Sequence, residues 1–336
     1  MTAAETVLIS SATVVDYLVS VGLVDATDHV EITPLAGGVS NTVLGVRSRA
    51  GSWVVKQSLP QLKVADTWLA TQERTLTEAA ALRLTHELTP QSVPEVVHID
   101  PQAFVLVIGW SKGADWKSLL LHGDADPAVG AALGQLLARW HVYFSHQPQM
   151  LQQIDSPEAF DQLRIDPFYR TTAARIPLVA DEVNRLISDM ADRQVTLVHG
   201  DYSPKNVLVD PRSASTPVVL DFEVTHRGDP AFDVAFMVSH LVLKAIHRPT
   251  ASASLINVAE TFLHSYRSGV REVSWRPEPS HLHRHLGALL LSRTDGKSRA
   301  EYLDEPQRET ARRLGLQILL NDQASDPLIR LKEELA

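Results

Sequence analysis

Residues 197–209 read Leu-Val-His-Gly-Asp-Tyr-Ser-Pro-Lys-Asn-Val-Leu-Val, and residues 218–223 read Val-Val-Leu-Asp-Phe-Glu. The apolar runs predict three short strands separated by a polar loop and a turn. Asp201 and Asn206 lie in the loop with four residues between them, and Asp221 ends the last strand. Phosphoryl-transfer enzymes use this arrangement to hold a hydroxyl nucleophile beside Mg²⁺. The stretch therefore predicts a catalytic centre.

The last two strands are expected to form a hairpin, because segment 210–217 consists almost entirely of turn-forming residues. If the strands pair symmetrically, Val207 faces Leu220, and Asn206 falls opposite Asp221. Cross-strand neighbours have Cβ atoms roughly 5 Å apart. An amide oxygen and a carboxylate at that distance can share one hard cation. The alternative is that Asp201 and Asn206 are ordinary turn residues. The compound spacing favours the functional interpretation.

Composition sets the broad class of the protein. The 336 residues are 44% hydrophobic and 21% charged, which is typical of a globular chain large enough for two lobes. The net charge of −9 argues against a nucleic-acid partner. The absence of cysteine excludes disulfides and thiolate chemistry. No signal peptide and no membrane span are expected, which makes the cytoplasm the default location.

The hydrophobic pattern changes near residue 108. Before it, the pattern predicts two helices, 11–23 and 71–86, and the strands 30–34, 42–47, 53–57, 96–99 and 104–108. After it, amphipathic helices are expected at 126–146, 178–193, 232–245, 254–269, 281–292 and 307–321. The sequence therefore predicts an α+β protein with a β-rich N-lobe, residues 1–108, and a mainly helical C-lobe, residues 109–336.

Two features of the N-lobe suit a nucleotide. Gly37 and Gly38, followed by Ser40 and Asn41, could close over phosphates with their backbone N–H groups. Two glycines between strands are, however, more often a plain hairpin turn. Lys56 ends an apolar strand, where a lysine is unusual, and an edge-strand lysine is the alternative. Glu78 is its expected partner, with Glu73 and Glu87 as competitors.

Other polar residues of the C-lobe are interpreted as structural. Asp229 is expected to cap the helix that begins near Phe232, and Asp233 is given a structural role as well. His199 is expected to support the catalytic loop by hydrogen bonding. His281, His283 and His285 alternate on a predicted helix, and a solvated face is favoured there over a metal site.

At these residues the chain resembles the small-molecule phosphotransferases of the aminoglycoside phosphotransferase and choline kinase type. The resemblance rests on His-Gly-Asp-x-x-x-x-Asn at 199–206 and Asp-Phe-Glu at 221–223, and on the order of glycine turn, strand lysine and helix glutamate before them. Residues 55–60, with Trp68 and Glu73 downstream, are similar to methylthioribose kinase. Protein kinases have glycine where this chain has Glu223, so a protein substrate is not expected.

The resemblance implies a bilobal protein-kinase-like fold and an ATP- and Mg²⁺-dependent phosphotransferase. Asp201 would deprotonate the substrate hydroxyl, Asn206 and Asp221 would hold Mg²⁺, and Lys56 would contact the phosphates. ATP would lie near Val107, Ile108 and Trp110. The residues proposed to line the acceptor pocket are Tyr202, Glu223, His226, Arg227 and Arg293.

The identity of the acceptor stays open at this point. A pentose-like sugar is favoured slightly over an aminoglycoside-type antibiotic or an amino alcohol such as choline or homoserine. A catalytically silent, ATP-binding pseudokinase is an alternative that the complete motif argues against. A hydrolase with paired carboxylates would leave Lys56 and the glycine turn unexplained. The oligomeric state cannot be deduced from the sequence.

Overall fold

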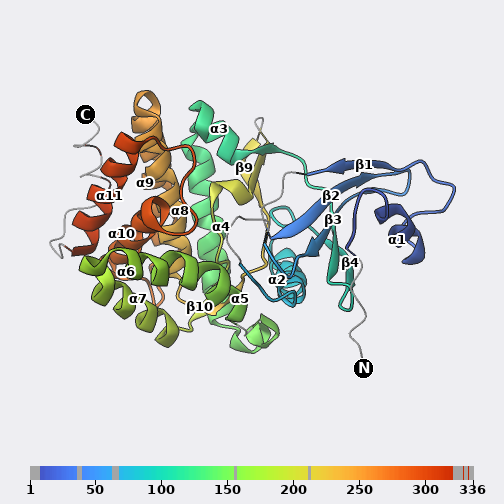
Figure 1. Cartoon of the computed structure of the whole chain (residues 1–336), viewed down its shortest axis with the longest axis horizontal. Helices are drawn as coiled ribbons and strands as arrows, with labels where there is room; N and C mark the ends of the chain where they lie inside the picture. Colours follow the sequence, from blue (N-terminus) through green and yellow to red (C-terminus); the bar gives the residue numbers. More distant parts are fainter. Residues whose placement is uncertain are drawn as a thin grey trace. The chain divides into compact units, whose positions relative to one another are not determined.

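The computed structural model describes residues 8–35, 40–62, 68–154, 157–210 and 213–320, together with Leu328 and Lys332. The chain divides into two compact units, residues 1–111 and 112–336 (Figure 1). The first is built on a sheet and the second on helices, which confirms the predicted fold class. Within the described ranges, no helix has both the length and the apolar character needed to cross a bilayer.

The first unit contains an antiparallel five-stranded sheet in the order β1-β2-β3-β5-β4. The apolar run at residues 105–108, which is buried throughout, suits a sheet covered on both faces. Val55 and Lys56 are neighbours on β3, so their side chains leave opposite faces. The strands are β1 (Glu31–Pro34), β2 (Asn41–Arg47), β3 (Ser52–Ser58), β4 (Val96–Asp100) and β5 (Val105–Gly109).

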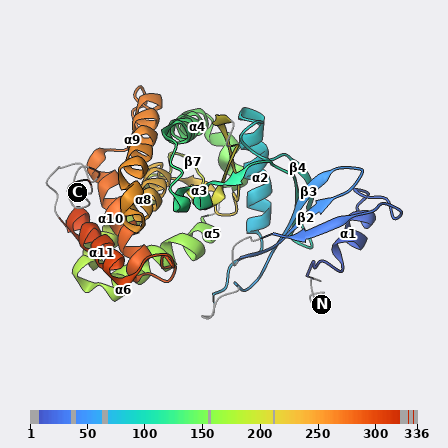
Figure 2. The same ribbon diagram turned by 90° about the horizontal axis from the view of Figure 1, so that it is seen from above.

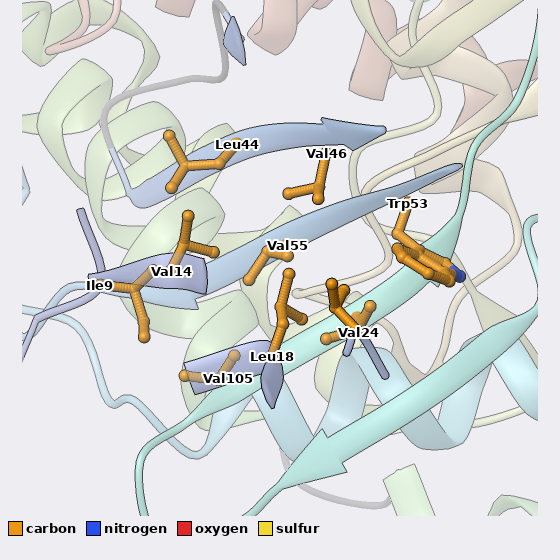
Figure 3. Packing of buried hydrophobic residues seen from close by; sticks show 10 residues of the cluster. Ile9, Val14, Leu18, Val24, Leu44, Val46, Trp53, Val55 and Val105 are labelled. Atoms are coloured by element: carbon orange, nitrogen blue, oxygen red, sulfur yellow. The ribbon is translucent and has the colours of Figure 1, made fainter. Parts of the chain in front are cut away.

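A short helix, α1 (Val14–Ser20), covers one face of this sheet. Val14 and Leu18 on α1 are fully buried and pack against Val55 and Val105 of the sheet (Figure 3). Burying side chains of this size contributes roughly 1.5–3 kcal/mol each. The longer helix α2 (Arg74–Leu88) packs against β3, β4 and β5.

The second unit is a layered helical assembly in which α4 packs on α9, α9 on α8, α8 on α10, and α10 on α11 (Figures 1 and 2). The contact between α4 and α9 is close because position 134 is a glycine. A Cβ there would collide with the carbonyl oxygen of Phe262. These helices are α4 (Pro127–Ser145), α8 (Ala231–His247), α9 (Ser252–Gly269), α10 (Pro279–Asp295) and α11 (Glu305–Leu320).

Smaller elements complete the second unit. Helix α3 and the helical segments between residues 148 and 175 were not predicted from the sequence pattern, whereas the helix that follows them was. They are α3 (Trp116–His122), a 3₁₀ segment (Pro148–Ile154), α5 (Glu158–Phe160), a π-helical segment (Asp161–Arg170) and α6 (Thr171–Arg175), followed by α7 (Ala180–Asp192). Five short strands form two small antiparallel sheets: β7 (Thr196–Val198) with β10 (His226–Gly228), and β6 (Ala114–Asp115) with β8 (Val207–Asp210) and β9 (Ser213–Val219).

Candidate active site

The loop that carries Asp201 and Asn206 runs from β7 to β8 and is held at both ends by strand pairing. It passes through Gly200 with φ +76°, and an added Cβ would lie 2.8 Å from the carbonyl oxygen of Val224. A glycine is therefore required for both conformation and space. A 3₁₀ turn, Pro204–Asn206, then brings Asn206 back beside Asp201.

Asp233, in the first turn of α8, fixes the backbone of this loop. Its Oδ2 accepts the amide hydrogen of His199 at 2.7 Å, and its Oδ1 accepts that of Gly200 at 2.8 Å. His141 of α4 lies on the same carboxylate, with Nε2 3.4 Å from Oδ2. Asp233 is completely buried. Asp233 therefore has a structural role, as predicted, and it acts on the loop that carries Asp201.

The His199 ring supports the loop from inside, as predicted. Its Nδ1 accepts the amide hydrogen of Asp201 at 3.1 Å, so Nε2 carries the proton and donates it to the carbonyl of Leu220 at 3.1 Å. Burial lowers the pKa of His199, partly offset by the carboxylates of Asp233, Asp201 and Asp221. The neutral ring therefore connects the loop to the strand that leads into Asp221.

The two carboxylate oxygens of Asp201 have different surroundings. Three groups contact Oδ2: Lys205 Nζ at 2.7 Å, Arg164 Nη2 at 2.8 Å and Asn206 Nδ2 at 2.8 Å. Oδ1 is buried and has no hydrogen-bond partner among the described residues. Burial raises the pKa of Asp201, but the charges of Arg164 and Lys205 outweigh it and hold the pKa below its usual value. Oδ1 is thus an ionised acceptor suited to a substrate hydroxyl.

Arg164 was not identified from the sequence. It lies on the π-helical segment, donates from Nε to the carbonyl of Gly200 at 2.8 Å, and holds Asp201 through Nη2. Its guanidinium lies over the Phe168 and Phe236 rings, at 5.7 and 5.9 Å from their centroids. A planar fork that contacts both a carbonyl and a carboxylate orients the loop in a way that lysine could not.

The predicted register of the hairpin is wrong by one residue. Val207 pairs with Val219, and the amide of Leu220 donates to the carbonyl of Asn206 at 2.8 Å, so Asn206 lies opposite Leu220. The turn-rich segment is not a long loop, because β9 begins at Ser213, and the register shifts between Leu208 and Asp210. Two steps along β8, from 208 to 210, correspond to five along β9, from 218 to 213, so β9 carries three extra residues, and no clear sequence signal marks such an irregularity.

Asp221 nevertheless lies in the electrostatic neighbourhood of Asp201, because its charge raises the pKa of the Asp201 carboxyl. Its backbone has φ +69°, a left-handed conformation that costs a non-glycine residue free energy and tends to occur at functional sites. The amide oxygen of Asn206 and the Asp221 carboxylate offer hard oxygen ligands. This donor set fits Mg²⁺.

In the first unit, Lys56 and Glu78 form a buried ion pair. Lys56 Nζ lies 2.6 Å from Glu78 Oε1, and the two side chains are 10% and 3% exposed. The two other glutamates considered as partners of Lys56 are exposed. Glu87 lies on α2, and Glu73 lies just before α2, where its carboxylate contacts Thr71. A lysine held in this way presents a fixed positive charge from the middle of the sheet.

The predicted glycine turn is only partly described. Gly37 and Gly38 lie outside the described residues. Asn41 donates to Ser40 Oγ at 3.1 Å and accepts from Ser58 Oγ at 3.0 Å. The end of the turn is further held by the fully buried Arg74, whose Nη2 donates to the carbonyls of Ser40, at 2.6 Å, and of Leu59.

Of the three residues expected beside ATP, Val107 and Ile108 lie near the end of β5, and Trp110 follows this strand. Val107 is committed to the hydrophobic cluster on the α1 face, and Ile108 is buried as well. Trp110 follows β5, stacks beneath the Arg47 guanidinium at 4.9 Å, and lies against Gly45. Of these three side chains, that of Trp110 is only partly buried, whereas the other two are buried in the core.

The five residues proposed for the acceptor pocket separate in the structure. Tyr202 is a core residue and not a substrate contact, because it is completely buried and its hydroxyl donates to the carbonyl of Leu133 at 2.9 Å. Glu223 is buried two residues after Asp221. His226, stacked on Phe160, and Arg227 both line a cavity of about 420 Å³.

Arg293 lies closer to the catalytic loop. It donates to the carbonyl of Ser298 and shares the Phe168 ring with Arg164. Burial lowers the pKa of Arg293, and the negative charge of Asp201 partly offsets this effect. A second buried cation, Lys244 of α8, was missed by the sequence analysis. Burial and the charges of Lys117 and Arg293 lower its pKa to about 7.

Comparison with known proteins identifies the family of the chain. A sequence profile of the phosphotransferase enzyme family (APH) matches residues 31–275. The chain belongs to this family. Both the Lys56–Glu78 pair and the 201–221 motif lie inside the matched range.

Methylthioribose kinases are among the relatives of the chain. The chain is 28% identical over 248 residues to methylthioribose kinase 2 of Oryza sativa subsp. japonica, which covers 64% of the chain and 57% of the rice enzyme. It is 24% identical over 304 residues to methylthioribose kinase of Bacillus pumilus, covering 79% and 75% of the two chains. The chain thus spans little more than half the length of the rice enzymes.

Solved structures share the fold at lower identity. A choline/ethanolamine kinase family protein from Mesorhizobium loti aligns with a TM-score of 0.55 and 15% identity, covering 96% of this chain and 98% of the other. Macrolide 2'-phosphotransferase MphH from Brachybacterium faecium aligns with a TM-score of 0.53 and 19% identity, covering 94% and 99%. The protein-kinase-like fold predicted from the sequence is confirmed.

Proposed function

We propose that the protein transfers the γ-phosphate of ATP to a hydroxyl group of a small molecule. One observation carries the proposal: the buried Asp201 carboxylate is held by three donors on Oδ2, while Oδ1 has no partner among the described residues. Oδ1 accepts the proton of the acceptor hydroxyl as phosphoryl transfer proceeds. Positioning and charge stabilisation are the main contributions of proteins to this reaction.

The other site residues take the remaining roles. Asn206 and Asp221 hold Mg²⁺, which when bound neutralises phosphate charge. Lys56, fixed by Glu78, contacts the phosphates, and the turn containing Gly37, Gly38, Ser40 and Asn41 covers them. The segment containing Val107, Ile108 and Trp110 provides the base site. These assignments follow the motif order shared with the family, which is the support they have.

A pentose-like sugar is the acceptor that we favour. Its support is the similarity to proteins named methylthioribose kinases, which covers most of this chain. Aminoglycoside-type antibiotics and amino alcohols remain alternatives within the same reaction. The location that we propose is the cytoplasm, where ATP and Mg²⁺ are available, and we propose no nucleic-acid or membrane partner.

The test is ADP release with ATP and Mg²⁺ against pooled pentoses, methylthioribose, hexosamines, aminoglycosides, choline and homoserine. Asp201→Asn should abolish acceptor-dependent ADP release and leave ATP affinity nearly unchanged, because only the acceptor hydroxyl is affected. Asp221→Ala should instead lose the Mg²⁺-dependent part of ATP affinity. Wild-type turnover in either variant would refute the proposal. ATP binding without ADP release in any pool would favour the pseudokinase alternative.

A further inference from the structure

Two of the three histidines on α10 are not on a solvated face, so that prediction is wrong for them. His281 is 2% exposed and His285 is completely buried, because the α10 face that carries them packs into the helical unit. Both rings point at one carboxylate, that of Asp229, which precedes α8. His281 Nε2 lies 2.6 Å and His285 Nε2 3.9 Å from Asp229 Oδ2.

The geometry points to a binding site for a Zn²⁺-type divalent cation formed by Asp229, His281 and His285. One ligand atom from each residue lies within 4.8 Å of the other two. Two histidines one helical turn apart, joined by a carboxylate, form a donor set that zinc accepts. With zinc–ligand bonds of about 2.0–2.2 Å, tetrahedral ligand atoms lie roughly 3.3 Å apart. The 2.6 Å separation would open and the 3.9 Å separation would close, each by less than an ångström.

An unsatisfied atom distinguishes this cluster from a plain hydrogen bond. His285 Nε2 is buried and has no hydrogen-bond partner among the described residues. Its other nitrogen, Nδ1, lies 2.8 Å from the hydroxyl of Tyr169, so the ring is held with Nε2 directed at the cluster. A buried polar atom without a partner normally costs free energy. Metal coordination would satisfy it.

The surroundings supply the outer contacts of a metal site. Asp229 is fixed at the start of α8, where Oδ1 accepts the amide hydrogen of Ala231 at 2.9 Å. On the far side of His281, Nδ1 lies 3.3 Å from Arg284 Nη2, which donates to it, and 3.9 Å from Asp189 Oδ2. A metal on Nε2 would move the ring proton to Nδ1, so the Arg284 guanidinium would have to turn away and leave Nδ1 facing Asp189. Carboxylate–histidine pairs of this kind orient zinc ligands.

The cluster borders a cavity on its Asp229 side. Asp229 lines the cavity of about 420 Å³ that His226 and Arg227 also line. Water or an anion in this cavity can complete a tetrahedron. Asp201 and Asp221 do not belong to the cluster, so the inferred site is separate from the Mg²⁺ site and does not depend on the proposed kinase activity.

The experiment uses the full chain without a histidine tag, stripped of metal and titrated with Zn²⁺ at neutral pH in excess Mg²⁺. We expect about one Zn²⁺ per chain, and Co²⁺ should give the intense visible absorption of a tetrahedral site. His285→Gln should abolish this binding, and Tyr169→Phe should weaken it about 10- to 100-fold, as expected for loss of an orienting contact. His283→Gln, on the same helix but outside the cluster, is the matched control.

The thermal unfolding of each variant is compared first, so that loss of metal is not confused with loss of fold. If His285→Gln does not fold, Tyr169→Phe carries the test. The inference is overturned if the wild-type chain takes up no Zn²⁺ beyond a trace. It is equally overturned if the variants at positions 285 and 169 bind as tightly as His283→Gln.

Discussion

Replacing Asp233 by asparagine should destabilise the helical unit without leaving a cavity, because the two side chains have the same shape. The carboxylate accepts two buried amide hydrogens, from His199 and Gly200, one on each oxygen. Asparagine has a single acceptor oxygen. Its NH₂ group must therefore face one of these amides, donor against donor.

The size of the effect follows from these contacts. A hydrogen bond to a charged group contributes about 1.5–3 kcal/mol, and a buried donor left unsatisfied costs about 1–3 kcal/mol. Part of this is offset because a neutral amide is easier to bury than a carboxylate. A net loss of about 3 kcal/mol is expected. In a unit of this size that lowers Tm by roughly 6–12 °C.

The assay is thermal unfolding followed by circular dichroism, with amide hydrogen exchange at positions 199 and 200 as the local readout. Asp192→Asn, at the exposed end of α7, is the control and should remain within about 0.5 kcal/mol of wild type. The amides of His199 and Gly200 should exchange faster only in Asp233→Asn. A Tm equal to that of the control, with unchanged exchange, would show that Asp233 does not hold the loop.

Three further changes test other parts of the molecule. Glu78→Gln should lower the free energy of denaturant unfolding by about 3–5 kcal/mol, because it leaves the buried charge of Lys56 without its counter-charge. The double variant with Lys56→Met should recover part of this loss. Between about pH 7 and 10.5 the unfolded chain binds one more proton at Lys244 than the folded chain does. The free energy of unfolding of wild type, relative to that of Lys244→Met, should therefore rise with pH through that window. Parallel curves of unfolding free energy against pH for the two proteins would contradict the lowered pKa. Arg164→Met removes a charge that lowers the pKa of Asp201, so the acidic limb of the pH–rate profile should move to higher pH.

Local sequence signals predicted the elements that have a strong period or a compound motif. The strands of the first sheet and the long helices α4 and α9 lie within a few residues of their predicted bounds, because their apolar faces match one secondary-structure period. The same holds for the Lys56–Glu78 pair, where one strand and one helix leave few possible partners. The spacing of Asp201 and Asn206 likewise found the loop correctly.

The sequence could not supply what depends on long-range packing. Arg164 lies on a π-helical segment that contains Pro167, so neither a helical period nor a motif marks it. The hairpin register was missed because of an irregularity after Leu208. The burial of two histidines of α10 was missed because they face a carboxylate that lies 52 and 56 residues away in the sequence.

Among the described residues, the contacts that hold Asp201, the proposed proton acceptor, come from the helical unit. Asp233 holds the backbone before it, Arg164 holds its Oδ2, and His199 connects it to the segment leading into Asp221. Asp221 itself is kept in a left-handed conformation, which persists only where surrounding contacts over-determine it. The Lys56–Glu78 pair belongs entirely to the first unit. Changes to that pair should therefore alter nucleotide affinity and leave the acidic limb of the pH–rate profile in place, whereas changes to Arg164 should do the reverse.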